Sequence, residues 1–343
     1  MDEISRTSDN QKLPVPLDSG IMYTLSAIYY VYVSQLLLKL NFKNEVNLVL
    51  SEILFFAVPP IILAVMRRYD IKKTFRLKAP RPLEVFLMLV ISPVMIIAGI
   101  CSGFLALLII KLIFGRVYLA GDIVSLMSNE LWISIFIMAV VPAVCEELLF
   151  RGMIQRGLER IGPVWGILLS GFLFGLFHFD FQRLAAQTLI GIIAAYVVYR
   201  TGSIYNGMIL HFMNNALLTL VSSQAIRMGG ETTQIVEDPF ASQEFASLAG
   251  ELGLSLEELL TFMGIGFAVV LVFSLIVIFF LLLGLNAVTK NTVEKPERLK
   301  GSAKGLLAGI PGLLLIAVVY TSLGLTLLDN NLGYEILRML GMM

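Results

Sequence analysis

Long apolar stretches alternate with short polar ones along this chain, and that pattern is typical of a helical membrane protein. Each apolar stretch is about 20 residues long, the length that an α-helix needs to cross about 30 Å of hydrocarbon. The pattern predicts an all-α, polytopic transmembrane helical bundle of about nine spans, with eight as the alternative count. The predicted spans are Ser19–Leu40, Val46–Met66, Leu83–Phe114, Leu131–Phe150, Val164–Phe179, Leu184–Tyr199, Ile204–Val221, Phe262–Leu285 and Leu306–Leu328.

The third span is longer than one crossing requires. Leu83–Phe114 contains Pro93, Gly99 and Gly103, so we expect a kink or a re-entrant piece there. Composition supports the membrane assignment, because only 15% of the 343 residues are charged, whereas about 25% is usual for a soluble domain. The formal net charge is zero, which gives no indication of nucleic-acid binding.

Basic and acidic residues are separated between alternate loops. Residues 67–81 hold seven lysines and arginines against Asp70, whereas residues 222–261 hold Arg227 against seven acids. The positive-inside rule then places the N-terminus in the cytoplasm and the acidic loop outside. We expect a multi-pass protein of a bacterial inner membrane or a plasma membrane. The expected parts are a cytoplasmic leader (1–18), N-terminal helices (19–130), a core of helices (131–221), an external loop (222–261) and C-terminal helices with a tail (262–343).

Two adjacent acids and a base interrupt the fourth span. Ionisable groups at membrane depth cost about 2.5–3.5 kcal/mol each, so they are retained for a purpose. Glu146 and Glu147 point about 100° apart on a helix and cannot do the same job. Glu147 is spaced i, i+4 from Arg151 and can pair with it, which leaves Glu146 free to act as a general base. The alternative is that both acids cap the end of the span beside arginines.

The two histidines of the chain, His178 and His211, both lie in apolar stretches. Phe174 shares a helical face with His178 and can fix its rotamer, while Gly171 and Gly175 form a GxxxG step for close helix packing. The alternative for His178 is a core histidine that is hydrogen-bonded to a backbone carbonyl.

His211 and Asn215 are also spaced i, i+4. Two donors one turn apart can hold the oxyanion of an attacked carbonyl. The alternative is hydrogen bonding between helices, worth about 0.6 kcal/mol on average. Asn214 points elsewhere on the helix, and we expect a structural role for it.

The chain turn at Gly162-Pro163 lies midway between Glu146 and His178, so an antiparallel hairpin brings these two to the same height. His211 lies only a few residues beyond the next turn. Glu146, His178 and His211 meet if the fourth and fifth helices extend beyond the membrane, or if the sixth helix is tilted. The stretch Gly152–Arg160 is polar enough to form such an extension. We therefore expect a site near the cytoplasmic face.

The motifs EExxxR, FxxxH and HxxxN, in this order on separate apolar helices, resemble the signature of the CPBP family. This family comprises CAAX prenyl proteases and their bacteriocin-processing and self-immunity relatives. The resemblance covers about residues 131–221 and implies an intramembrane endopeptidase in which Glu146 activates the hydrolytic water. It further implies supporting roles for Glu147 and Arg151, a water-positioning role for His178, and oxyanion binding by His211 and Asn215.

Zinc is the alternative to a metal-free glutamate mechanism. The chain has no HExxH, so a catalytic zinc would need Glu146 or Glu147 beside the two histidines. We expect no cofactor, with membrane lipid around the protein and a peptide or membrane-protein substrate. Two other classes of protein are alternatives for the same polar residues. One is a non-catalytic scaffold or immunity protein. The other is a proton-coupled transporter, but the sequence shows no inverted repeat of the kind that many transporters have.

Overall fold

The computed structural model describes residues 13–40, 42–119, 130–227, 236–290, 293 and 296–342. Helices make up most of this part. The first half contains α2 (Pro16–Ile28), η1 (Tyr29–Val33), α3 (Ser34–Leu38), α4 (Asn44–Glu52), η2 (Ile53–Ala57), α5 (Val58–Met66), α6 (Ile71–Thr74), α7 (Pro82–Phe114), β1 (Tyr118–Leu119), α9 (Leu131–Ile135), η3 (Phe136–Val140), α10 (Val141–Glu147), η4 (Leu148–Ile154) and α11 (Gln155–Leu158). The second half contains α12 (Pro163–Leu176), α13 (Leu184–Thr201), α14 (Ile204–Arg227), β2 (Val236–Glu237), η5 (Pro239–Ala241), α15 (Gln243–Glu251), α16 (Leu256–Val288), η6 (Ser302–Gly309), α17 (Ile310–Leu327) and α18 (Asn331–Met339).

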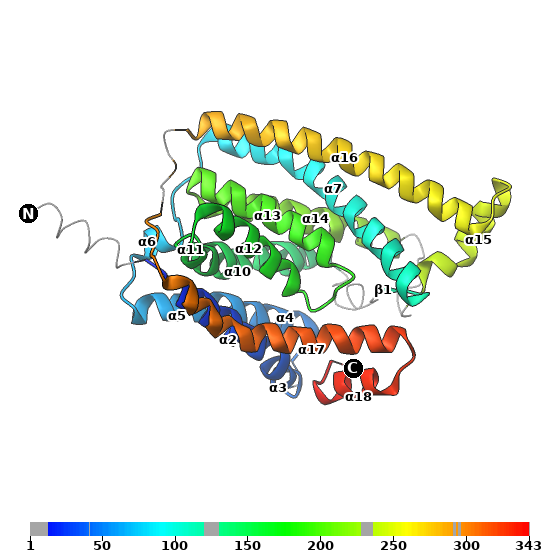
Figure 1. Cartoon of the computed structure of the whole chain (residues 1–343), viewed down its shortest axis with the longest axis horizontal. Coiled ribbons are helices and arrows are strands. Elements are labelled where there is room, and N and C mark those ends of the chain that lie inside the picture. The colour runs from blue at the N-terminus through cyan, green and yellow to red at the C-terminus, as the bar shows by residue number, and fades with distance from the viewer. Residues whose placement is uncertain are drawn as a thin grey trace, which may run out of the picture.

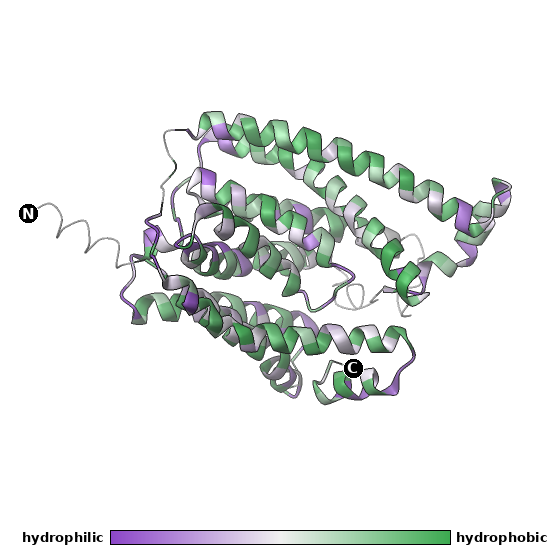
Figure 2. Cartoon of the chain, in the orientation of Figure 1, coloured by the Kyte–Doolittle hydropathy of each residue, from purple (hydrophilic) through white to green (hydrophobic). Residues whose placement is uncertain are grey.

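The helices form three layers (Figure 1). α7 and α16 lie side by side in one outer layer, and α2, α4, α5 and α17 form the other. The segment α9–α11 and the helices α12, α13 and α14 fill the middle layer, packed on both sides. Figure 2 shows that the helices are mostly hydrophobic along their length and that polar residues gather at their ends, as a lipid-embedded bundle requires.

The predicted helical bundle is confirmed, and a helix lies at each of the nine predicted spans. Within the described residues, six helical segments are long and apolar enough to cross a membrane. The segment Pro163–Leu176 is shorter, with 14 residues. At 1.5 Å per residue it spans about 21 Å, and it lies in the middle layer. The expected re-entrant piece in the third span is wrong: α7 is one helix of 33 residues that continues through Pro93, held by α13, α14 and α16 on its sides.

The acidic loop after α14 contains ordered segments. Its strand β2 pairs antiparallel with β1, so that Tyr118 faces Glu237. Asp238 forms an ion pair with Lys111 in the last turn of α7, and Arg116 pairs with Asp329 beyond α17. These contacts join the loop to the ends of α7 and α17.

At the opposite end of the bundle, a polar network closes the start of α2. Tyr69 donates a hydrogen bond of 2.6 Å to Asp18, and Arg67 lies 3.5 Å from the other oxygen of that carboxylate. Burial, together with the bond to Asp18, raises the pKa of Tyr69 well above its usual value, so the phenol stays protonated and donates. Nearby, Arg76 bonds to the buried Glu159, with distances of 2.6 and 2.8 Å.

This network explains how the fourth helix extends beyond its predicted end. The helical segment continues from Phe150 through η4 and α11 to Leu158. The extension is buried. Its polar Gln155 is satisfied there, because it donates to Glu159 and to the carbonyl of Ala195. The polar stretch after Arg151 is therefore an integral part of the bundle.

The glycines of the GxxxG step bring α12 and α13 into backbone contact. A Cβ atom on Gly171 would lie 2.5 Å from the backbone nitrogen of Ile192, and one on Gly175 would lie 2.9 Å from that of Thr188. A Cβ on Gly191 of α13 would in turn lie 2.8 Å from the carbonyl oxygen of Gly171. Only glycine permits this separation, as in small-residue packing of membrane helices.

We expect Gly171→Ala to lower the free energy of unfolding by about 1–3 kcal/mol, because the new methyl group meets backbone that cannot move aside. The matched control is Gly266→Ala in α16, where a Cβ meets nothing within 4 Å. Thermal unfolding in detergent measures both. Equal midpoints for the two variants would contradict the close packing.

Candidate active site

A buried ion pair forms the base of the site. Glu147 and Arg151, on successive turns of the fourth helix, are both almost fully buried, and Arg151 Nε lies 3.4 Å from Glu147 Oε2. Arg151 Nη2 also donates to the carbonyl oxygen of Gly191 at 3.3 Å. This hydrogen bond joins the fourth helix to α13 at Gly191, where α13 also approaches α12 closely.

His211 connects both glutamates to α14. Its Nδ1 lies 3.2 Å from Glu147 Oε1, and its Nε2 lies 4.0 Å from Glu146 Oε2. Glu147 therefore has a hydrogen-bond partner in His211 on Oε1 and an ion-pair partner in Arg151 on Oε2, although Oε2 makes no hydrogen bond in the described residues. Glu146 has no such partner at hydrogen-bond distance in the described residues, and its side chain retains 15% exposure. The two adjacent acids occupy different environments, as their helical spacing predicts.

Phe174 lies at the centre of the three helices. Its ring meets His178 edge to face at 5.0 Å and His211 at 5.7 Å between ring centroids. The guanidinium of Arg151 lies 4.5 Å from the same ring, within cation–π distance. His178 Nδ1 lies 3.0 Å from the carbonyl oxygen of Phe174. Phe174 thus places His178 beside Arg151 and His211. The Nδ1 of His178 is close to a backbone carbonyl, as expected if His178 is a core histidine.

Asn215 donates to the carbonyl oxygen of Met138 at 3.1 Å and accepts from Asn214 at 3.0 Å. Met138 lies in the π-helical segment η3. Asn215 thereby joins α14 to the fourth helix. The expectation that Asn214 points away from the site is wrong, because Asn214 is buried and lines the same small cavity as His211 and Glu147.

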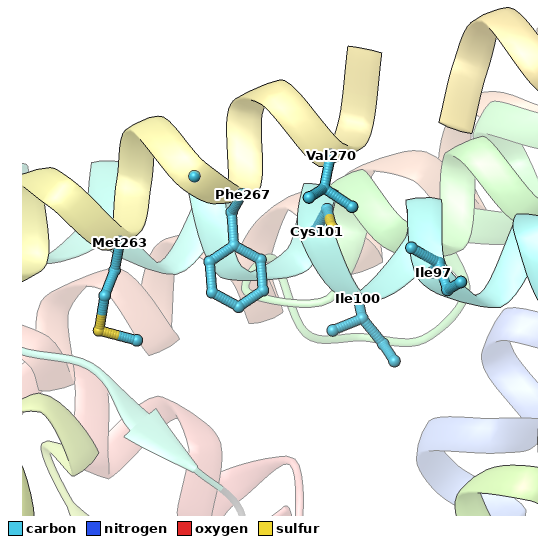
Figure 3. A pocket seen from close by; sticks show the side chains of 7 residues that line it. Ile97, Ile100, Cys101, Met263, Phe267 and Val270 are labelled. Carbon is cyan, nitrogen blue, oxygen red and sulfur yellow. The ribbon is translucent and has the colours of Figure 1, made fainter. Parts of the chain in front are cut away.

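That cavity has a volume of about 10 Å³, close to the minimum that a water molecule occupies. Its lining residues are Glu147, Arg151, Phe174, Gln187, Ile190, Ala194, His211 and Asn214. A much larger groove of about 420 Å³ lies between α7 and α16 (Figure 3). It is lined by Ile97, Ile100, Cys101, Met263, Gly266, Phe267 and Val270. None of the predicted site residues lines it, and its apolar side chains suit contact with lipid.

Two residues near the cluster are absent from the predicted set. Gly207 precedes His211 by one turn, and a Cβ there would lie 2.5 Å from Glu147 Oε2. No sequence signal marks this glycine. Glu52, the last residue of α4, has a buried Oε2 with no hydrogen-bond partner in the described residues, and α4 packs against α10. An acid within the span Val46–Met66 is the same signal that singles out Glu146, so Glu52 could have been found.

Among the described residues, no group of three or more His, Cys, Asp and Glu side chains converges to hold a metal ion. His178 and His211 both contact the ring of Phe174.

The fold and the cluster define a polytopic helical membrane protein with a buried acid–base site. Residues 128–217 match the family model of Rce1-like proteins, described as type II CAAX prenyl endopeptidase Rce1-like. A protein of Bacillus subtilis (strain 168) with the name "Putative membrane peptidase YdiL" is 28% identical over 94 residues. That match covers 27% of this chain and 38% of the relative. No solved structure matches. Both matches fall on the helical core of the chain and support its resemblance to the CPBP family of membrane proteases.

We expect Arg151→Met to lower the free energy of unfolding by about 3–5 kcal/mol, because it leaves Glu147 buried without its cation. The double variant with Glu147→Gln should recover part of this loss. The control is Arg183→Met, whose pair with Asp180 is more exposed and is worth at most about 1 kcal/mol. Additive effects of Arg151→Met and Glu147→Gln would contradict the coupling.

We expect Gly207→Ala to displace the Glu147 carboxylate and to lower the free energy of unfolding by about 1–3 kcal/mol, because the added methyl group meets a buried ion pair. Gly264→Ala is the control, because its Cβ would meet only the end of the flexible Leu108 side chain. A thermal midpoint of Gly207→Ala equal to that of Gly264→Ala would contradict the contact with Glu147.

Proposed function

We propose that this protein is an intramembrane endopeptidase of the glutamic type, with Glu146 as the residue that activates water. The observation that carries the proposal is the difference between the two glutamates. Glu147 is occupied by Arg151 and His211, while Glu146 is partly exposed and 4.0 Å from His211. A carboxylate with an open side can take a proton from water, which is the requirement for a general base.

In the proposed reaction, Glu146 accepts a proton from water as the water oxygen attacks the peptide carbonyl. The carbonyl oxygen becomes an oxyanion, and the new C–O bond gives a tetrahedral intermediate. When the C–N bond breaks, the proton held by Glu146 passes to the leaving amine. Glu146 is then ionised again, and the products are a carboxylic acid and an amine.

The remaining residues stabilise charge and geometry in this scheme. The ring of His211, held through its Nδ1 by Glu147, is the proposed donor to the developing oxyanion. Asn215 supplies a second donor when its amide leaves the Met138 carbonyl. His178, held by Phe174, positions the attacking water. Glu147 and Arg151 keep His211 in place.

The proposed substrates are peptides or membrane-associated proteins. Bacteriocin maturation, signal-peptide processing or immunity against such peptides are the biological roles that fit a CPBP-type core. The charge distribution supports a cell-membrane location with the N-terminus in the cytoplasm, because residues 67–81 are basic and residues 222–261 are acidic.

Glu146→Gln should lower cleavage of a quenched membrane-peptide library by about 10²–10⁴-fold, the range of a general base. The control is Glu335→Gln, an exposed acid on α18, which should cleave at the wild-type rate. Both are assayed with and without a strong zinc chelator, and we expect no effect of the chelator.

Loss of wild-type cleavage on chelation, with recovery on adding zinc, would contradict the metal-free mechanism while retaining the peptidase. Undiminished cleavage by Glu146→Gln would contradict the role of Glu146.

A further inference from the structure

Phe179 directly follows His178 and adopts a backbone conformation that is rare for a bulky residue. Its φ is +52°, in the left-handed region, where a residue with a Cβ atom is disfavoured. Helices often end through one residue in this conformation, and that residue is usually glycine. A bulky residue keeps it only where the surrounding structure holds it, and such residues cluster at functional sites. Phe179 therefore calls for an explanation beyond core packing.

Aromatic side chains hold the ring of Phe179. The residue is buried, with 3% exposure. Its ring stacks on that of Tyr30 in η1, with 4.7 Å between the centroids and 10° between the planes. It also meets Phe177 edge to face at 5.3 Å. Because such ring pairs are favourable, these contacts offset the disfavoured backbone conformation and bind the turn after His178 to the first span.

Two tyrosines of the outer layer hold the last turn of α12, two residues before His178. The hydroxyl of Tyr23 in α2 donates to the carbonyl oxygen of Leu173 at 3.2 Å. The hydroxyl of Tyr320 in α17 donates to the carbonyl oxygen of Leu176, also at 3.2 Å. The end of α12 is thus bound through its backbone to α2 and α17, and through the Phe179 ring to η1.

We propose that Phe179 is a positioning residue for His178. The left-handed turn ends α12 immediately after the histidine, and the stacked ring holds that turn in place. The backbone of His178 is then fixed on both sides, and its ring is presented in the one orientation that contacts Phe174 edge to face at 5.0 Å. Phe179 does not touch the substrate. This inference rests on the proposed function, in which His178 positions the attacking water.

The test compares substitutions of Phe179 with the same substitutions of Phe240. Phe240 is also 3% exposed and also contacts two aromatic rings. It lies in η5, outside the left-handed region, in a hydrophobic cluster that contains none of the site residues. Each phenylalanine is replaced by alanine and by glycine. The readouts are the thermal midpoint in detergent, and kcat and KM for cleavage of the membrane peptide at a temperature below all the midpoints.

The left-handed turn predicts opposite orders of thermal stability at the two positions. Glycine adopts a φ of +52° without strain, so Phe179→Gly should unfold at a higher temperature than Phe179→Ala. At position 240 the alanine variant should be the more stable, because glycine loses more conformational freedom on folding. Phe179→Ala that is more stable than Phe179→Gly would contradict the turn.

The positioning role predicts a catalytic loss that is specific to Phe179. We expect Phe179→Ala to lower kcat by about tenfold or more, with KM within about threefold of wild type, because a displaced His178 impairs the chemical step. Phe179→Gly should lose less, since it keeps the turn. Phe240→Ala should keep the wild-type kcat, although it loses a ring of the same burial.

Two further comparisons separate positioning from packing. Tyr30→Leu removes the stacked ring and should lower kcat, whereas Tyr30→Phe keeps a ring there and should restore the wild-type value. This pair also decides the question if Phe179→Ala does not fold. In the His178→Ala background, Phe179→Ala should lower kcat no further, because the side chain that it positions is gone.

Wild-type kcat in Phe179→Ala would overturn the proposal, as would an equal loss in Phe240→Ala or a full further loss in the His178→Ala background. Glu146→Gln is measured beside these variants. Its cleavage of the peptide would overturn the peptidase mechanism itself, whereas an inactive Glu146→Gln with a fully active Phe179→Ala would overturn only the role of Phe179.

Discussion

The core of this protein depends on the pairing of buried charges with other protein groups, because water does not solvate those charges. Glu147 and Arg151 are almost fully buried, and a charge in such a setting is tolerated only when it is paired and hydrogen-bonded. The pairing extends from Glu147 to His211 on α14 and from Arg151 to the Gly191 carbonyl on α13. One ion pair thus holds three helices in register. It also occupies Glu147, whereas Glu146 has no hydrogen-bond partner in the described residues.

Glycine packing makes this arrangement possible. The approach of α12 to α13 through Gly171 and Gly191 sets the distance at which Phe174 meets the histidines. Gly207 leaves room for the Glu147 carboxylate beside α14. These residues carry no chemistry, yet each sets a position that a single methyl group would change. In a bilayer, where lipid competes with helix packing, such close contacts supply much of the cohesion between helices.

Much of this could be predicted from the sequence. Apolar segments of about 20 residues identify the helices, and the i, i+4 spacing of Glu147 and Arg151 identifies their pair. Helical spacing alone could not reveal which asparagine faces the cavity, because the π-helical segments η3 and η4 shift the register of the facing helix. Nor could it reveal Gly207, since its importance arises from a carboxylate 60 residues earlier in the chain. Glu52 could have been found by the reasoning that identifies Glu146, because both are acids within a predicted span.

The central claim is that Glu146 activates water and does not itself attack the substrate. A single-turnover cleavage in H₂¹⁸O, with excess enzyme, tests this most directly by mass spectrometry of both the product and the enzyme peptide that contains Glu146. The account predicts ¹⁸O in the new carboxyl group of the product and none in the enzyme. Incorporation of ¹⁸O into the Glu146 side chain would reveal a covalent anhydride intermediate and contradict the mechanism.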